Sequence, residues 1–327
     1  MVVFSVKFYQ ALHHTLVLLA AGSVVIFSWA YLHLPQANLL IVVFAFLAAV
    51  RISELASLKI RTQVLAGMVL AAAFLQYTVN ATYHVHFLNT VLPAAASWFI
   101  LRILPPASAY PVLLTGFQAY TAEPGAYAAA QRSIDILLAG VVAWFITLPF
   151  TGRTAPDQSE NIGKPLAKRE AFLESFTLLC ATILYKFSAM PQGIWIVLTT
   201  IFIYIARQPG TPDNKLVRQR IFSVPAGILL GGIYSGSVVM LDYRLAYLAP
   251  LIGAVGFFML YYRHDFFSFS LFFMIAFTIC ADWMTGSFRE FNFLQLLFAR
   301  TLATLIGAAL LLFIEKSAAD FYGEAAA

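Results

Sequence analysis

The chain has 327 residues, of which 61% are hydrophobic and 11% are charged, and its mean hydropathy is +0.83. This composition is too apolar and too poor in charge for a soluble globular fold, so we expect a membrane protein. The net charge of +5 arises from short loops between apolar runs, and we draw no nucleic-acid partner from it.

Apolar runs of suitable length predict six helices in the first repeat, residues 1–150. The first helix is expected over 10–32, and Pro35 begins a short second helix that ends at Arg51. Period-two alternation of polar and apolar residues is absent, which favours helices throughout. The remaining runs of this half are 63–82, 88–104, 108–122 and 128–150.

A polar stretch, residues 151–169, is the expected cytoplasmic linker to a second repeat over 170–316. A polar cytoplasmic tail is expected over 317–327. The predicted fold class is therefore an all-α polytopic membrane protein with twelve transmembrane helices. The six runs of the second repeat are 170–188, 192–206, 221–241, 245–262, 266–285 and 292–314.

Two local similarities indicate that the halves are copies of one module. Pro191, Gln192 and Arg207 follow their counterparts Pro35, Gln36 and Arg51 at a constant separation of 156 residues. Arg132 and Arg300 each begin a similar closing run, 168 residues apart. Because each half has six spans, both have the same orientation, which predicts two parallel six-helix repeats.

The distribution of Lys and Arg supports this span count. With a cytoplasmic N-terminus, fifteen of the twenty basic residues fall on the cytoplasmic side of the predicted spans, as the positive-inside rule requires. We therefore expect a multi-pass membrane protein with both termini in the cytoplasm. The first apolar run is too long for a cleavable signal peptide and is expected to remain as a helix.

Three features of the second half form a recognisable pattern: a short apolar helix ending at Arg207, a glycine-rich helix reading R-x6-G-x3-G from Arg220, and a closing helix reading R-x6-G from Arg300. This pattern resembles the fusaric acid resistance family, which includes bacterial aromatic carboxylic acid exporters and is related to aluminium-activated malate transporters. The similarity is clearest over 191–236 and 292–314. It implies proton-driven export of small organic anions. Many family members carry a large cytoplasmic domain after each half. In this sequence only the linker and the tail occupy those positions, so the resemblance implies no role of such domains here.

Arg300 and its counterpart Arg132 are the first candidates for substrate binding. A guanidinium within a span costs about 2.5–3.5 kcal/mol unless it faces protein or water, and its planar fork suits a carboxylate. The alternative is a structural role, through an ion pair or a side chain that reaches the outer surface. For Arg132 that alternative is concrete, because Asp135 lies three residues further along the same helical face.

Arg51 and Arg207 end the two short helices on the predicted cytoplasmic side. A positive ring there would concentrate anions before transport. The alternative is that they only set the topology. For proton coupling, Asp135 and Asp282 are the candidate carboxyl groups within spans, whereas Glu174 is expected close enough to the inner surface to contact water.

Small residues on one helix predict close helix packing. Gly227 with Gly231, and Gly232 with Gly236, form two G-x-x-x-G steps. Packing is favoured here over direct substrate contact.

Sequence signatures of enzymes, metal sites and ATP-driven pumps are absent, so we expect no enzyme activity and no cofactor. Cys180 and Cys280 lie within predicted spans and are expected to pack there. The expected partners are a small organic anion, the lipid bilayer, and either a second copy of the chain or a separate periplasmic or cytoplasmic chain. Two alternatives to an exporter stay open: a passive organic-anion channel, and a non-transporting membrane scaffold or assembly factor.

Overall fold

The computed structural model describes residues 58–121, 165–190, 192–207, 213–239, 242–285 and 293–323, together with isolated residues between 8 and 19 and between 130 and 145. This part of the chain is helical throughout its regular structure. Four of its helices are long and apolar enough to cross a membrane. They cover Lys168–Ser188, Asn214–Ser237, Arg244–Arg263 and Leu297–Phe321.

Three helices of the first half are described, and each overlaps a predicted span. They are α3 (Leu58–Ala81), α4 (His86–Ile103) and α5 (Pro106–Phe117), and a 3-10 turn, Gln118–Thr121, follows α5. Leu104 ends α4 in an extended conformation because the residue before a proline, here Pro105, disfavours helical geometry. The spans predicted over 10–32, 35–51 and 128–150 lie outside the continuously described residues.

Each of the six spans predicted in the second half corresponds to a helix. They are α7 (Lys168–Ser188), α8 (Trp195–Ala206), α9 (Asp213–Tyr234), α10 (Ala249–Arg263), α11 (Phe266–Thr285) and α13 (Phe293–Gly323). A π-helical turn, Ser235–Val239, and a 3-10 helix, Tyr243–Leu248, connect α9 to α10.

Two helices are longer than their apolar runs. α9 begins at Asp213 instead of near 221, and α13 continues to Gly323 instead of ending near 314. The added segments contain Lys, Arg, Gln, Glu and Ala, which are good helix formers although they are too polar for a span. The apolar runs predicted where the helices lie, whereas the helix propensity of the flanking polar residues determines where these two helices begin or end.

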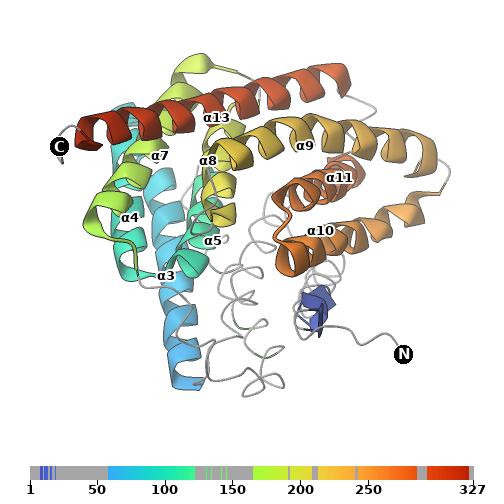
Figure 1. Cartoon of the computed structure of the whole chain (residues 1–327), viewed down its shortest axis with the longest axis horizontal. Helices are drawn as coiled ribbons and strands as arrows, with labels where there is room; N and C mark the ends of the chain where they lie inside the picture. The colour runs from blue at the N-terminus through green and yellow to red at the C-terminus, as the bar shows by residue number, and fades with distance from the viewer. Residues whose placement is uncertain are drawn as a thin grey trace.

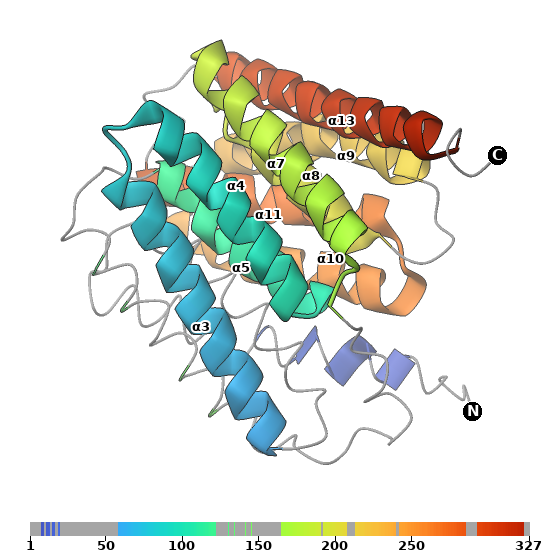
Figure 2. The ribbon, with the colours of Figure 1, turned by 90° about the vertical axis from the view of Figure 1, so that its left-hand side faces the viewer.

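The short helix α8 is the centre of the described structure. It contacts α5, α7, α9 and α13, and all its residues except Ile205 are buried (Figures 1 and 2). A helix that is apolar on every face is stable only when other elements surround it. In Figure 1, α13 lies along α9, α11 packs on α9 on the side away from α13, and α10 packs on α11.

Glycines allow α9 and α11 to approach closely. A Cβ at Gly227 would lie 2.6 Å from the Met274 Cβ, and one at Gly231 would lie 2.8 Å from the Thr278 Cβ, so α9 packs backbone-to-backbone on α11. Gly232 is also buried, whereas Gly236 faces open space. The first G-x-x-x-G step therefore lies in a helix interface, and Gly236 does not.

Polar contacts show which helix ends lie together. Arg102 at the end of α4 donates from Nη1 to the carbonyl of Leu166, just before α7, at 2.6 Å. At the opposite end of α7, Lys186 contacts Asn89 near the start of α4. α4 and α7 therefore run antiparallel to each other.

Candidate functional site

Two groups of residues around α8 contain buried charged side chains. We call the first the arginine–aromatic column; it consists of Trp195, Phe202, Arg220, Phe273, Phe277 and Arg300. We call the second the Glu174 cluster; it consists of Tyr110, Glu174, Arg207 and Glu315. The column lies between α8, α9, α11 and α13, and the cluster joins α5 and α7 to the ends of α8 and α13.

Arg300 lies at one end of the column, near the start of α13. The residue is only 5% exposed, and its Nε donates to Oε1 of Gln192 at 3.3 Å. Its guanidinium carbon lies 5.2 Å from the centroid of the Trp195 ring and 4.9 Å from that of Phe277. The cation is therefore held mainly by aromatic faces.

The positive charge of Arg300 has no carboxylate partner within the described part of the chain. Its Nη1 is buried without a hydrogen-bond acceptor there, and the two ion pairs found among these residues involve only Arg207. Removing a cation from water without a counter-charge is costly, and contact with aromatic rings offsets that cost only in part. An anion at Nη1 would complete the site.

Arg220 lies at the other end of the column, near the start of α9. In the sequence this residue opens the R-x6-G-x3-G pattern and was given no binding role, but its side chain is completely buried. Nη1 donates to Oγ of Ser270 at 2.6 Å, and the guanidinium carbon lies 4.5 Å from the centroid of the Phe202 ring. Among the described residues, neither Nε nor Nη2 has an acceptor.

The sequence contained a signal that Arg220 would be buried. Arg220, Gly227 and Gly231 are separated by seven and four residues, so they share one helical face. Since the glycines predicted a helix interface on that face, the arginine had to be buried in it as well.

The two arginines are connected by ring contacts between α8 and α11. Phe202 lies 5.3 Å from Phe273 between ring centroids, Phe273 lies 6.3 Å from Phe277, and Phe277 lies 5.4 Å from Trp195. Such rings stack well on other aromatic rings. The column therefore combines cations at its ends with aromatic faces between them.

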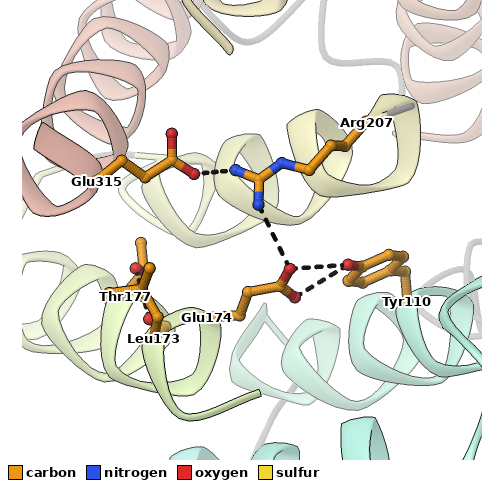
Figure 3. Close-up of polar contacts among 6 residues, drawn as sticks. All are labelled: Tyr110, Leu173, Glu174, Thr177, Arg207 and Glu315. Atoms are coloured by element: carbon orange, nitrogen blue, oxygen red, sulfur yellow. Dashed lines mark hydrogen bonds and ion pairs between the residues drawn. The ribbon is translucent and has the colours of Figure 1, made fainter. Parts of the chain in front are cut away.

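The Glu174 cluster is shown in Figure 3. Glu174 is 3% exposed, and the Tyr110 hydroxyl donates to its carboxylate with both oxygens at 3.0 Å. Nη1 of Arg207 lies 3.7 Å from Oε1 of Glu174, and Nη2 of the same guanidinium pairs with Oε1 of Glu315. The Arg207 guanidinium also lies over the ring of Tyr204 at 4.8 Å.

This geometry changes the interpretation of two residues. Glu174 was expected to contact water, and that expectation is wrong, because α5, α8 and α13 surround it. Arg207 was predicted to attract anions at the inner mouth, but here two carboxylates neutralise it. Because it pairs with two acids, Arg207 offers little attraction to a further anion.

For the other predicted site residues the structure describes no side chain. Arg51, Arg132 and Asp135 lie outside the described residues. Asp282 lies in α11, but its side chain is not among those described. Arg300 and Arg207 lie at opposite ends of α8, so the structure does not bring them into one site.

Within the described ranges, no group of His, Cys, Asp and Glu side chains is arranged to hold a metal ion. The arrangement instead suits the binding of an anion and the exchange of a proton. Comparison with known proteins adds no assignment, because no protein-family model, no curated protein and no solved structure matches this chain.

Proposed function

We propose that this protein is a secondary active exporter of small organic anions, in particular aromatic carboxylates, driven by the proton gradient across a bacterial inner membrane. The observation that carries the proposal is the buried guanidinium of Arg300, which has aromatic neighbours and no carboxylate partner among the described residues. The resemblance of the Arg and Gly spacings to the fusaric acid resistance family points to the same class of substrate.

The chemistry of the column matches an aromatic carboxylate in two ways. A carboxylate at the free Nη1 of Arg300 would supply the missing acceptor and the missing counter-charge. The aromatic ring of the same ligand would meet Trp195 and Phe277, which flank that guanidinium. An aliphatic carboxylate would use only the guanidinium, and an aliphatic cation would neither supply the missing acceptor nor stack on the aromatic rings.

Proton coupling needs a carboxyl group that can change its charge during transport. Asp135 and Asp282 stay predictions for this role. Glu174 is a third candidate, since it is buried and shares Arg207 with Glu315. A proton on Glu174 would weaken its attraction to Arg207, so the charge state of this carboxyl could change the contact between α7 and α8.

Two other functions make different demands on the same residues. A passive anion channel would use the arginines without any titrating acid. A non-transporting scaffold would need Arg300 only as an internal structural contact. The unfilled Nη1 favours binding of a ligand over the scaffold, because a structural arginine gains stability by pairing all its donors.

The test is uptake of radiolabelled benzoate into inside-out vesicles, with and without an imposed pH gradient. We expect accumulation in the wild type only with the gradient, and at least a tenfold lower initial rate for Arg300→Lys, which keeps the charge but loses the planar fork. Arg244→Lys is the matched control, because this arginine is exposed on the 3-10 helix away from the column, and it should transport normally.

Each alternative predicts a different result in the same vesicles. Equilibration of benzoate without accumulation would identify a channel. A wild type that moves none of several carboxylates, while Arg300→Lys lowers only the melting temperature, would leave the scaffold as the remaining function.

A further inference from the structure

Arg220 is completely buried, and most of its N–H groups have no acceptor among the described residues. Nη1 is occupied by Ser270, whereas Nε and Nη2 have no acceptor within the described structure. Each buried donor left without an acceptor costs about 1–3 kcal/mol, and more on a charged group. This site is therefore incomplete without a further group.

The position of the free donors identifies the chemistry of that group. The N–H of Nε and one N–H of Nη2 point in the same direction along one edge of the planar guanidinium, and their spacing matches the two oxygens of a carboxylate. Here this two-donor edge is the one that lacks acceptors, while the opposite nitrogen is bound to protein. A single-atom anion such as chloride would fill the edge less completely.

We propose that Arg220, oriented by Ser223 and Ser270, is a second carboxylate-binding site, separate from the one at Arg300. The inference rests on the proposed function for the identity of the ligand, which is the carboxylate of the transported aromatic anion. The site itself rests on the unfilled edge of a completely buried arginine.

The neighbours of Arg220 hold the guanidinium in one orientation. Oγ of Ser270 accepts from Nη1 at 2.6 Å and also from Oγ of Ser223 at 2.7 Å, so α9 and α11 fix one side of the group together. The Phe202 ring covers one face of its plane. Ser223 and Ser270 are thus positioning residues, which keep the two-donor edge free for a ligand.

The two arginine sites lie along one route. Phe202 contacts Arg220 and Trp195 contacts Arg300, and these two aromatic residues are seven positions apart on α8, which is about 10 Å along a helix. An aromatic carboxylate is a little shorter than this separation. Its transfer from one guanidinium to the other, along the rings of Phe273 and Phe277, would be a single step.

The experiment is equilibrium dialysis of radiolabelled benzoate against the full chain in lipid nanodiscs, in a buffer free of chloride and phosphate. We expect two benzoates per wild-type chain, one for Arg220→Lys and one for Arg300→Lys. Arg218→Lys is the matched control, because Arg218 is exposed on the same helix two residues earlier, and it should still bind two. Inorganic phosphate at equal concentration should displace benzoate less than unlabelled benzoate does.

A second variant covers the case in which Arg220→Lys fails to fold. Ser270→Ala keeps the charge of Arg220 and removes its anchor, so it should weaken one of the two binding events about tenfold and leave the other unchanged. A folded Ser270→Ala chain that binds both benzoates with wild-type affinity would contradict the positioning role.

The outcomes separate this inference from the proposed function. Two benzoates bound by Arg220→Lys, or one bound by the wild type and lost only in Arg300→Lys, would overturn the Arg220 site and leave the exporter standing. One benzoate lost only in Arg220→Lys, in a protein that transports nothing, would support the site and contradict the exporter. A wild type that binds none would overturn both.

Discussion

At the scale of single residues, the Glu174 cluster shows how strongly a charge depends on its partners. Arg207 is paired with Glu174 and Glu315, and its side chain is 31% exposed whereas that of Glu174 is 4% exposed. Breaking a buried ion pair by removing one member leaves the other charge without compensation. The arginine is therefore more important for stability than either acid alone.

We predict that Arg207→Met lowers the stability of the protein by about 2 kcal/mol, less than the 3–5 kcal/mol of a fully buried pair because water reaches part of the guanidinium. The double variant Arg207→Met/Glu174→Gln should recover part of this loss, since the more deeply buried of the two carboxylates is no longer left without its cation, whereas Glu315 still is. The test is a double-mutant cycle, in which melting temperatures in detergent are compared for the wild type, Arg207→Met, Glu174→Gln and the double variant. A double variant no more stable than Arg207→Met would contradict the ion pair.

Glu174 also carries a prediction about transport. Glu174→Gln should abolish accumulation of benzoate driven by a pH gradient but preserve exchange of internal for external benzoate, because exchange needs no net proton movement. Vesicles loaded with unlabelled benzoate measure the exchange. Full gradient-driven accumulation in a folded Glu174→Gln protein would exclude this residue as the coupling group and leave Asp135 and Asp282.

At the scale of elements, contacts between helix backbones determine the shape of the column. Gly227 and Gly231 place α9 on α11, and Gly307 places α13 on α8, where an added Cβ would lie 2.5 Å from the carbonyl oxygen of Ile196. The first contact holds Arg220 next to Ser270, and the second holds Arg300 near Trp195. Both arginines thus owe their positions to glycines about two or three turns further along the same helix.

We predict that Gly227→Ala destabilises the protein by about 1–3 kcal/mol, because its Cβ would collide with Cβ of Met274 and with the carbonyl oxygen of Leu271 at 2.8 Å. Gly236→Ala should be close to neutral, since no atom lies within 4 Å of its Cβ position. Thermal unfolding of the two variants side by side makes the comparison. Equal melting temperatures would show that α9 does not pack on α11 through Gly227.

At the scale of the whole molecule, the ends of the helices divide into two groups. The ion pair of Arg207 with Glu315 joins the ends of α8 and α13, while the contact of Gln192 with Arg300 joins their starts. These two helices are therefore parallel, and α7 is antiparallel to α4. The same arrangement follows from a chain that crosses the membrane with every span.

Labelling of introduced cysteines tests this topology. In a chain with Cys180→Ser and Cys280→Ser, we expect a membrane-impermeant maleimide to modify Lys215→Cys only from the cytoplasmic side and Arg244→Cys only from the opposite side. The two positions lie at opposite ends of the predicted span between them, and both side chains are exposed. Labelling of both from one side would contradict the predicted crossing.

The sequence by itself determined the class of the protein and the positions of its described helices. Apolar runs predicted α3 to α5 and all the helices of the second half, because the length and hydropathy of a span are local properties of the chain. The position of Arg300 within an apolar run marked it as a candidate site residue, and the spacing of Gly227 and Gly231 predicted a helix-packing face. Helix ends such as Asp213 and Gly323 were missed because polar residues also form helices.

Only the tertiary structure decided which charges have partners. Glu174, Arg207 and Glu315 are far apart in the sequence, and α7, α8 and α13 bring them together. Arg220 and Ser270 meet only because α9 and α11 approach at their glycines. The free energy of a buried charge depends on the atoms within a few ångströms of it, and those atoms come from other helices. The sequence therefore indicated a membrane protein with arginines in its apolar runs, and the packing showed which of the described arginines are buried without a carboxylate partner.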